Sequence, residues 1–286
     1  MVRRKGEFRK RENIVFFLRH LEYLVPRIAP YADLWNIFNE FNNGGSADLY
    51  DRKANCLAAH ARGAEIIRAH SGAPVSTAHA MCPYQPFDPE DAFDVTRTRI
   101  ANWVVNDFFY HAIRTGEILF PYRDGETVPG LKGSCDFWSI NYYTRHFITA
   151  RTGDGSAKRH ECHKIRPIRK DFYLEEFYPQ GLVDGLCALK DLPVHITENG
   201  FCCDDDRLRI LYLARHLQAL AEAMKRGCDV RGYFHWSFLD NFEWWSFVPR
   251  FGMVDVDFKT FARTPKPSAY FFRDVIRNNG FDRDLL

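Results

Sequence analysis

The chain has 286 residues, is 46% hydrophobic and 15% aromatic, and carries a formal net charge of +2 at pH 7. Such a length can bury one large core, and so balanced a charge does not favour nucleic acid or an anionic membrane surface as the main partner. No uncharged run approaches the roughly 18 residues of a membrane span, and no apolar segment of a secretory leader follows the basic N-terminus. The eight cysteines are scattered apart from Cys202-Cys203, which argues against a disulfide framework. We therefore expect a cytoplasmic globular protein.

Apolar residues at helical spacing predict six helices along the chain. The first ends near Pro26, Gly116 and Gly227 stop the third and the fifth, and Ser268 is expected to cap the last. The predicted helices span residues 12–25, 53–69, 91–114, 180–189, 208–224 and 268–277.

Short apolar runs between these helices predict strands. They span residues 34–39, 74–80, 137–143, 193–200 and 230–236. Because strands and helices alternate, we expect an α/β fold with a parallel sheet and right-handed crossovers, in a single domain over residues 1–286. Five strand–helix units are counted, whereas a (β/α)8 barrel of the TIM type has eight. The sequence thus predicts a barrel-type fold that is incomplete.

Polar side chains follow the ends of the predicted strands, where α/β enzymes keep their chemistry. These residues are Asn39 and Glu40, His79, Asn141 and Tyr143, Glu198 and Asn199, and His235 and Trp236. Two carboxylates so far apart in sequence face one another only if the sheet curves. If they do, glycoside hydrolysis is the natural interpretation, because it uses one protonated and one ionised carboxyl group. For the strand that ends at Glu198, a strand that simply ends in a solvated turn is the alternative. The two histidines are better explained as hydrogen-bonded core or rim groups than as catalysts.

Tryptophans and acidic residues gather after the last predicted strand, between Trp236 and Trp245. Indole faces stack on the C–H surface of a sugar, and a carboxylate such as Glu243 accepts hydrogen bonds from neighbouring hydroxyls. The stretch therefore indicates a sugar-binding rim, with a core tryptophan cluster as the alternative.

Several motifs in order resemble family 1 of the glycoside hydrolases, the family of β-glucosidases, β-galactosidases and related retaining β-glycosidases. The matching segments are Phe38-Asn39-Glu40, Asn141-Tyr142-Tyr143-Thr144, Ile196-Thr197-Glu198-Asn199-Gly200, Gly232 to Ser237 continuing to Trp244, Arg250 to Asp257, and Arg263 to Ser268. The resemblance extends from about Gly6 to Gly280.

The resemblance implies a role for each matching residue. Glu198 would be the nucleophile, Glu40 the acid/base and Tyr143 the residue that orients the nucleophile. The substrate-binding residues would be Asn39, Asn141, Trp236, Glu243 and Trp244. No metal or cofactor is implied, and the substrate would be a β-glycoside, such as a terminal β-D-glucosyl residue. Because an acid at position 243 would repel a phosphate, an unphosphorylated sugar is expected.

The chain also departs from the family pattern. Phe41 stands where the family usually has proline, and we find no counterpart of the first three strand–helix units, which carry further sugar-binding groups. An open sheet would expose its edges, so we expect a homo-oligomer or a partner chain to cover them. A relative with little or no activity, which acts as a sugar-binding or assembly component, is the alternative function.

Two further motifs are interpreted as solvated surface. His160-Glu161-Cys162-His163 lacks the second ligand pair of a zinc site, and the basic run Lys164–Lys170 has no interleaved aromatic residues of a nucleic-acid site.

Overall fold

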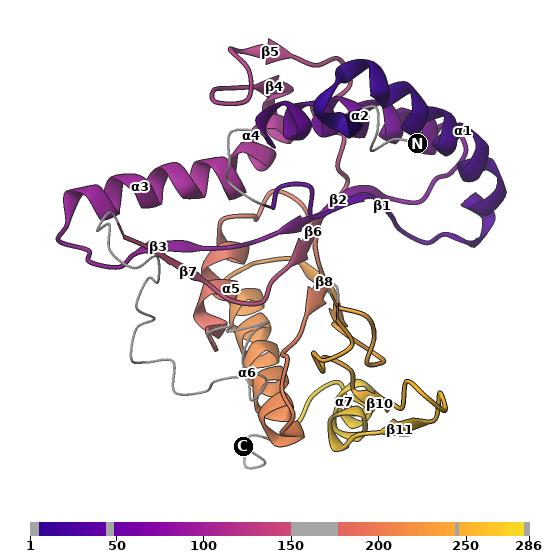
Figure 1. Cartoon of the computed structure of the whole chain (residues 1–286), viewed down its shortest axis with the longest axis vertical. Coiled ribbons are helices and arrows are strands. Elements are labelled where there is room, and N and C mark those ends of the chain that lie inside the picture. The colour runs from indigo at the N-terminus through magenta and orange to yellow at the C-terminus, as the bar shows by residue number, and fades with distance from the viewer. Residues whose placement is uncertain (1–5, 44–48, 150–176, 244–245, 283–286) are drawn as a thin grey trace. The chain divides into compact units, whose positions relative to one another are not determined.

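Helices and strands alternate along the chain in the computed structural model, which describes residues 6–43, 49–149, 177–243 and 246–282 (Figure 1). Contacts divide the chain into two units. The first unit comprises Met1–Asn141, His146–Gly155 and Asp191–His195, and the second comprises Tyr142–Arg145, Ser156–Lys190 and Ile196–Leu286. Strand β8 (Val194–Asn199) thus begins in the first unit and ends in the second. The expected single domain remains a prediction.

The central strands lie where the sequence predicts them. In the first unit, β1 (Trp35–Asn39), β2 (Val75–Ala80) and β6 (Trp138–Asn141) pair in that order, and both pairings are parallel. The amide of Trp138 donates to the carbonyl of Pro193 (2.8 Å), which brings the start of β8 beside β6. In the second unit, β9 (Val230–His235) follows β8, and the amide of Trp236 donates to the carbonyl of Asn199 (2.9 Å).

The helices alternate with these strands, and three small strand pairs lie outside the central sheet. The helices are α1 (Ile14–Ile28), α2 (Tyr50–Arg68), α3 (Ala92–Asn102), α4 (Phe108–Thr115), α5 (Pro179–Cys187), α6 (Asp206–Lys225) and α7 (Pro267–Asn278). Short helical turns are η2 (Glu7–Arg9), η3 (Arg11–Asn13), η4 (Ala29–Tyr31) and the π-helical η6 (Trp103–Asp107). The small pairs are β3 (Tyr84–Pro86) with β7 (His146–Ile148), β4 (Glu117–Ile118) with β5 (Glu126–Thr127), and β10 (Val254–Val256) with β11 (Arg263–Pro265).

Apolar packing of α1 and α2 on β1 and β2 forms a core of the first unit (Figure 1). The buried cluster consists of Leu21, Val25, Trp35, Ala64, Ile67 and Val75. Helices α1 and α2 approach closely at Gly63, where an added Cβ would lie 3.0 Å from a methyl carbon of Leu21. Each fully buried large side chain contributes about 1.5–3 kcal/mol, so this layer holds β1 and the residue after it in place.

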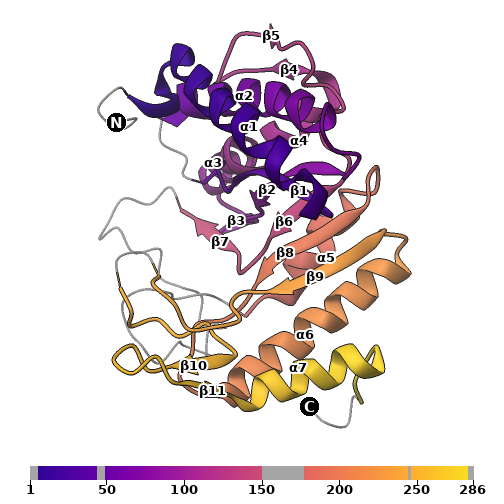
Figure 2. The same cartoon turned by 90° about the vertical axis from the view of Figure 1, so that its right-hand side faces the viewer.

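In the second unit, α6 and α7 lie side by side, and α5 packs on α6 (Figure 2). Phe201, Cys203 and Tyr212 form a buried cluster, with the partly buried Phe177 and Leu208 against it. Phe201 follows β8 by two residues, and its ring stacks on that of Tyr212 from α6 (5.1 Å between centroids). The loop after β8 is therefore packed onto α6.

Three sequence predictions are wrong in detail. Helix α1 continues through Pro26 to Ile28, because a proline near the helix end removes only one donor and the amide of Ala29 still bonds to Val25. The long helix predicted over 91–114 is interrupted by the π-helical turn η6 before it ends at Gly116, which has a φ of 85°. Ser268 does not cap α7, because its amide and hydroxyl both donate to the Asp206 carboxylate (2.6 and 2.8 Å).

A buried lysine on α2 makes the stability of the fold depend on pH. Burial of Lys53 lowers the pKa of its ammonium group to about 8, and its Nζ donates to the carbonyl of Val104 (3.4 Å) in the π-helical turn. Since the folded-state pKa lies below the unfolded value, the penalty for charging Lys53 is fully present below about pH 8 and is relieved as the pH rises toward the unfolded pKa.

We expect the free energy of unfolding of wild type relative to Lys53→Met to rise by about 2 kcal/mol between about pH 7 and about pH 9.5. Denaturant unfolding of both proteins at the two pH values measures this difference. Titrating groups that the two proteins share contribute equally to both free energies of unfolding, so their contributions cancel. Lys225→Met, at an exposed position near the end of α6, is the control and should show no such change. Parallel pH profiles for wild type and Lys53→Met would contradict the prediction.

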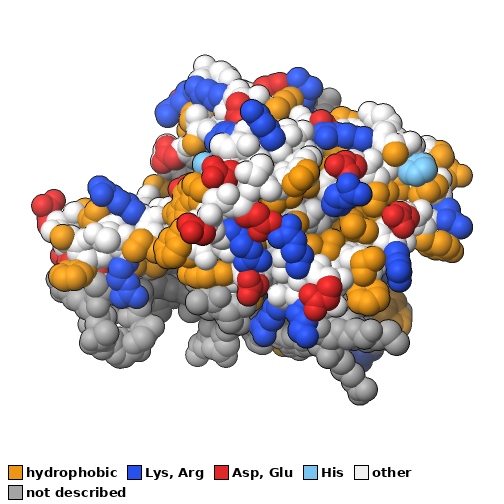
Figure 3. All heavy atoms as spheres, turned by 90° about the horizontal axis from the view of Figure 1, so that it is seen from above, with side chains coloured by type: hydrophobic (Ala, Val, Ile, Leu, Met, Phe, Trp, Pro, Cys, Tyr) orange, Lys and Arg blue, Asp and Glu red, His pale blue; other side chains and the backbone are white. Residues whose placement is uncertain are grey.

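Acidic and basic side chains are interspersed on the face seen in Figure 3. Exposed ion pairs of the first unit include Arg62 with Glu65 (2.6 Å) and Arg114 with Asp191 (2.6 Å). Such exposed pairs contribute little to stability. Within the described residues, no helix is long and apolar enough to cross a membrane.

Candidate active site

Glu40 directly follows β1, and its carboxylate accepts hydrogen bonds from two side-chain amide groups. Its backbone has a φ of 51°, and its amide donates to the carbonyl of Ala78 on β2 (2.8 Å). Asn141 donates from Nδ2 to Oε1 of Glu40 (3.0 Å), and Asn43 donates from Nδ2 to Oε2 (2.7 Å). Each carboxylate oxygen thus accepts a hydrogen bond from a neutral amide donor, which fixes the orientation of the group.

The strand register explains why Asn141 reaches Glu40. Strand β2 lies between β1 and β6, with Asn39 opposite Ala78 and Asn141 opposite Ala80, so the carboxyl ends of the outer strands meet at one edge. The buried Asn141 side chain donates to Oδ1 of Asn39 as well (3.0 Å). Asn39, Glu40 and Asn141 are therefore brought together as one polar cluster, as their positions in the sequence predict.

Glu198 lies near the end of β8, and its carboxylate is hydrogen-bonded to a tyrosine. The hydroxyl of Tyr143 donates to Oε2 of Glu198 (2.7 Å), and the carbonyl of Tyr143 accepts from the hydroxyl of Tyr212 on α6 (2.8 Å). The amide of Tyr142 donates to the carbonyl of Glu198 (2.9 Å). Both the backbone and the side chain of Glu198 are thus held by the segment that follows β6.

The neighbouring Asn199 is fully buried and fixes the end of the strand. Its Nδ2 donates to the carbonyl of Tyr142 (2.6 Å) and to the hydroxyl of Tyr212 (3.0 Å), while its Oδ1 accepts from the hydroxyl of Tyr233 (2.8 Å). The position of Asn199 at a strand end is predictable from the sequence, but its hydrogen bonds with Tyr212 and Tyr233 are not. The signal was weak, because Tyr212 belongs to a predicted helix and Tyr233 to a predicted strand.

Trp236 and Glu243 form a pair after β9. The indole Nε1 of Trp236 donates to Oε1 of Glu243 (2.9 Å), and Glu243 is buried. Burial raises the pKa of the Glu243 carboxyl group, an effect that hydrogen bonds from Trp236 and Asn241 partly offset. The predicted site residue Trp244 lies outside the described residues, as do the His160–His163 motif and the basic run after it.

Gly200 makes the closest backbone approach of this region. An added Cβ would lie 1.6 Å from the carbonyl oxygen of Trp236, so only glycine lets the turn after β8 pack against the residue after β9. The spacing between the Glu198 segment and the Trp236 segment depends on this contact.

We expect Gly200→Ala to lower the free energy of unfolding by at least about 3 kcal/mol, because a backbone oxygen cannot move aside as a flexible side chain would. Thermal or denaturant unfolding measures the loss. Gly72→Ala is the matched control, since an added Cβ there has no heavy atom within 4 Å. Equal stabilities of the two variants would contradict the close contact.

Other candidate residues serve the core. His79 is fully buried between Asn42 and the ring of Phe109, and burial lowers the pKa of its imidazole to about 3. His235 at the end of β9 is half-buried, and desolvation of its imidazole lowers its pKa to about 3. Phe41, at the position where the family usually has proline, is buried against the rings of Phe38 and Phe109. Within the part of the chain that the structure describes, no group of three His, Cys, Asp or Glu residues could hold a metal ion.

Comparison with known proteins assigns the chain to a family. Residues 1–281 match the profile of Glycosyl hydrolase family 1, and the chain belongs to this family. It is 33% identical to a β-galactosidase of Sulfolobus acidocaldarius over 82% of the chain and 49% of that protein. It is 26% identical to a 6-phospho-β-galactosidase of Staphylococcus aureus over 96% of the chain and 73% of that protein.

Solved structures agree with this assignment. A family 1 β-glucosidase from Thermotoga maritima superimposes with a TM-score of 0.82 at 25% identity, over 98% of this chain and 71% of that one. A β-glycosidase from Pyrococcus horikoshii gives a TM-score of 0.82 at 28% identity, over 100% and 70% of the two chains. The predicted family and the α/β fold of the (β/α)8 barrel type are thus confirmed. The chain spans about half the length of the curated β-galactosidases that it matches, 49% for the first.

Proposed function

We propose that this chain carries the catalytic carboxylates of a retaining β-glycosidase, with Glu198 as nucleophile and Glu40 as acid/base. The observation that supports the proposal most is the setting of the two groups. Each lies at or just after the end of a central strand, and each carboxylate accepts a hydrogen bond from a neutral side-chain donor. Membership of Glycosyl hydrolase family 1 supports the same assignment.

The proposed reaction has two steps. An oxygen of Glu198 bonds to the anomeric carbon while the bond to the leaving oxygen breaks, and Glu40 gives its proton to that oxygen. Water then attacks the anomeric carbon, Glu40 takes a proton from it, and the bond between the sugar and Glu198 breaks. The Tyr143 hydroxyl orients Glu198 throughout, and Asn141 and Asn43 hold the carboxyl group of Glu40 in reach of the leaving oxygen.

The remaining predicted residues are proposed to bind the sugar. Asn39 would donate to the hydroxyl next to the anomeric carbon, with Asn141 setting the orientation of its amide. The pair of Trp236 and Glu243 would supply an aromatic face and a carboxylate acceptor for ring hydroxyls, and Trp244 would add a second indole. A carboxylate at this position repels a phosphate group, so we propose an unphosphorylated substrate with a terminal β-D-glucosyl or related residue.

Hydrolysis of an aryl β-D-glucoside tests the proposal. Release of the phenol, with the β-anomer of the sugar seen first by proton NMR, is the expected result of a double displacement. Initial appearance of the α-anomer would contradict the retaining mechanism. Absence of turnover, with sugar binding retained in calorimetry, would instead support the alternative of a sugar-binding relative.

We further propose that a second copy of the chain or a partner chain covers the edges of the central sheet. Five central strands are present among the described residues, and the matched solved β-glucosidase is covered over 71% of its length. Strands β1 and β9 end the hydrogen-bonded order, so each offers an edge for pairing. A purified protein that sediments as a monomer and melts cooperatively without a partner would contradict this proposal.

None of the described cysteines forms a disulfide, which supports a cytoplasmic location.

A further inference from the structure

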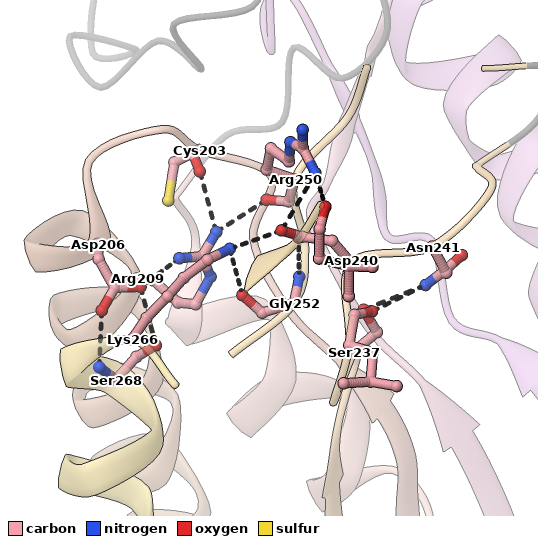
Figure 4. A network of polar contacts seen from close by, with 12 residues as sticks. Cys203, Asp206, Arg209, Ser237, Asp240, Asn241, Arg250, Gly252, Lys266 and Ser268 are labelled. Atoms are coloured by element: carbon pink, nitrogen blue, oxygen red, sulfur yellow. Dashed lines mark hydrogen bonds and ion pairs between the residues drawn. The ribbon is translucent and has the colours of Figure 1, made fainter. Parts of the chain in front are cut away.

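A buried aspartate in the loop after β9 gathers two cations and a backbone amide (Figure 4). The side chain of Asp240 is fully buried. Its Oδ1 accepts from the amide of Gly252 (2.8 Å), while its Oδ2 faces Nζ of Lys266 (3.0 Å) and Nη1 of Arg250 (3.4 Å). Lys266 also donates to the carbonyl of Gly252 (2.8 Å). A buried carboxylate with this many partners is costly to disturb, so it fixes the segments that supply them.

Those segments run beside Ser237, the second residue after β9. The amide of Ser237 donates to the carbonyl of Phe251 (3.2 Å), and the amide of Met253 donates back to Ser237 (3.0 Å). Gly252 fits only because it lacks a side chain, since an added Cβ would lie 2.1 Å from the amide nitrogen of Asp240. The Asp240 contacts thus fix where the backbone of Phe251 lies.

Phe251 in turn contacts the tyrosine that holds Glu198. The buried ring of Phe251 meets the ring of Tyr143 edge to face, with 6.2 Å between centroids and 81° between planes. The hydroxyl of Tyr143 donates to Glu198 (2.7 Å). A continuous series of contacts therefore joins Asp240 to Glu198 through Gly252, Phe251 and Tyr143, all within the second unit.

A second ion pair, between Arg209 and Asp206, belongs to the same network (Figure 4). Arg209 on α6 is buried, pairs with Asp206, and donates from Nη2 to the carbonyls of Cys203 (2.9 Å) and Arg250 (2.8 Å). Asp206 also accepts from Ser268 at the start of α7. Asp206 thus ties α6 to α7, and among the described residues its hydrogen bonds go to Arg209 and Ser268 rather than to Phe251 or Tyr143. It offers a matched comparison for Asp240.

We propose that Asp240 is a positioning residue for Glu198, which acts by fixing Phe251 and through it Tyr143. The inference rests on the proposed function of Glu198 and adds a residue to which no role in the reaction had been given. Loss of the Asp240 charge releases Lys266 and Arg250, and the 250–254 segment then shifts relative to Ser237. Because a small displacement of a reacting group lowers its rate strongly, the effect falls on kcat rather than on the affinity for the sugar.

The experiment compares Asp240→Asn with Asp206→Asn in the full chain, with an aryl β-D-glucoside as substrate. We expect Asp240→Asn to lower kcat by about 10- to 100-fold with KM changed less than about threefold. Asp206→Asn should lower the melting temperature but keep kcat within about twofold of wild type, since its contacts hold helices together. Equal effects of the two substitutions on kcat, or a loss in KM alone, would overturn the proposal.

Hydrogen exchange separates failure of this inference from failure of the proposed function. The amide of Tyr142, bonded to the carbonyl of Glu198, should exchange faster in Asp240→Asn than in wild type and should be unchanged in Asp206→Asn. The exchange rate can be measured even if the wild-type chain shows no turnover. Absence of turnover would refute the proposed function but not the positioning role of Asp240. Unchanged exchange at Tyr142 in Asp240→Asn would refute the positioning role.

Lys266→Met provides a second variant if Asp240→Asn fails to fold. The Lys266 side chain is 16% exposed, so its loss disturbs the core less, and it removes one of the two cations that face Asp240. We expect the same selective loss of kcat and the same faster exchange at Tyr142, each smaller than in Asp240→Asn. An unchanged kcat together with unchanged exchange in Lys266→Met would overturn the proposal independently.

Discussion

Glu198→Gln should lower kcat/KM for an aryl β-D-glucoside by about 10⁴-fold or more, because an amide cannot form the covalent bond to the anomeric carbon. Tyr143 would still meet an acceptor oxygen at the position of Oε2, so the fold around β8 should be retained. Steady-state kinetics and the melting temperature, measured together, check both parts of this prediction.

The shorter variant Glu198→Ala gives a sharper test of the same role. It leaves room for azide on the face of the sugar from which Glu198 would attack, and the product should be the α-glycosyl azide, formed with a single inversion. Glu222→Gln, on the exposed side of α6, is the control and should retain wild-type turnover. Full activity of Glu198→Gln would remove this residue from the mechanism.

Glu40→Ala should have an effect that depends on the leaving group. A dinitrophenyl glucoside needs little help from an acid, so its covalent intermediate should still form and accumulate, whereas an alkyl glucoside should lose about 10²- to 10⁴-fold in rate. Pre-steady-state measurement of phenol release shows the accumulation as a burst. The rate of the later steps should fall because no base remains for the incoming water.

Azide also distinguishes the two carboxylates. It needs no base, so it should restore turnover of the dinitrophenyl glucoside by Glu40→Ala and give the β-glycosyl azide, the opposite anomer to that expected with Glu198→Ala. Asn43→Ala removes one of the two donors to Glu40 and should show the same dependence on leaving group in weaker form. A loss in Glu40→Ala that is equal for good and poor leaving groups would contradict its role as acid.

The strand ends could be predicted from the sequence because their signals are local. Apolar runs that stop at a polar residue mark β1, β6 and β8, and the structure confirms Asn39, Glu40, Asn141 and Glu198 at or next to those ends. The family motifs add Tyr143, which lies just beyond β6, and the bond of its hydroxyl to Glu198 agrees with the orienting role implied by the resemblance. The roles of these residues in catalysis stay predictions.

Features set by distant contacts could not be predicted. Ser268 has the residue type of a helix cap, but Asp206 on a different helix takes both of its donors. The π-helical turn η6 adds no pattern of its own to a continuous helical periodicity. Asn43 belongs to a segment with loop composition, which does not reveal that its side-chain amide donates to Glu40. Asp240 contacts residues that are 10 to 26 positions away in the sequence, so local patterns do not reveal these contacts either.

The tight glycine contacts determine which positions of the turns after β8 and β9 can be varied. Gly200 and Gly252 meet backbone atoms at distances that admit no other residue, so libraries that vary these turns would consist mostly of unfolded variants. Phe238 and Phe242, in the same loop after β9, are 71% and 52% exposed, and their side chains can be exchanged without opening the core. Saturation of these two positions, with the glycines left intact, would therefore vary the surface of this loop without disturbing its backbone.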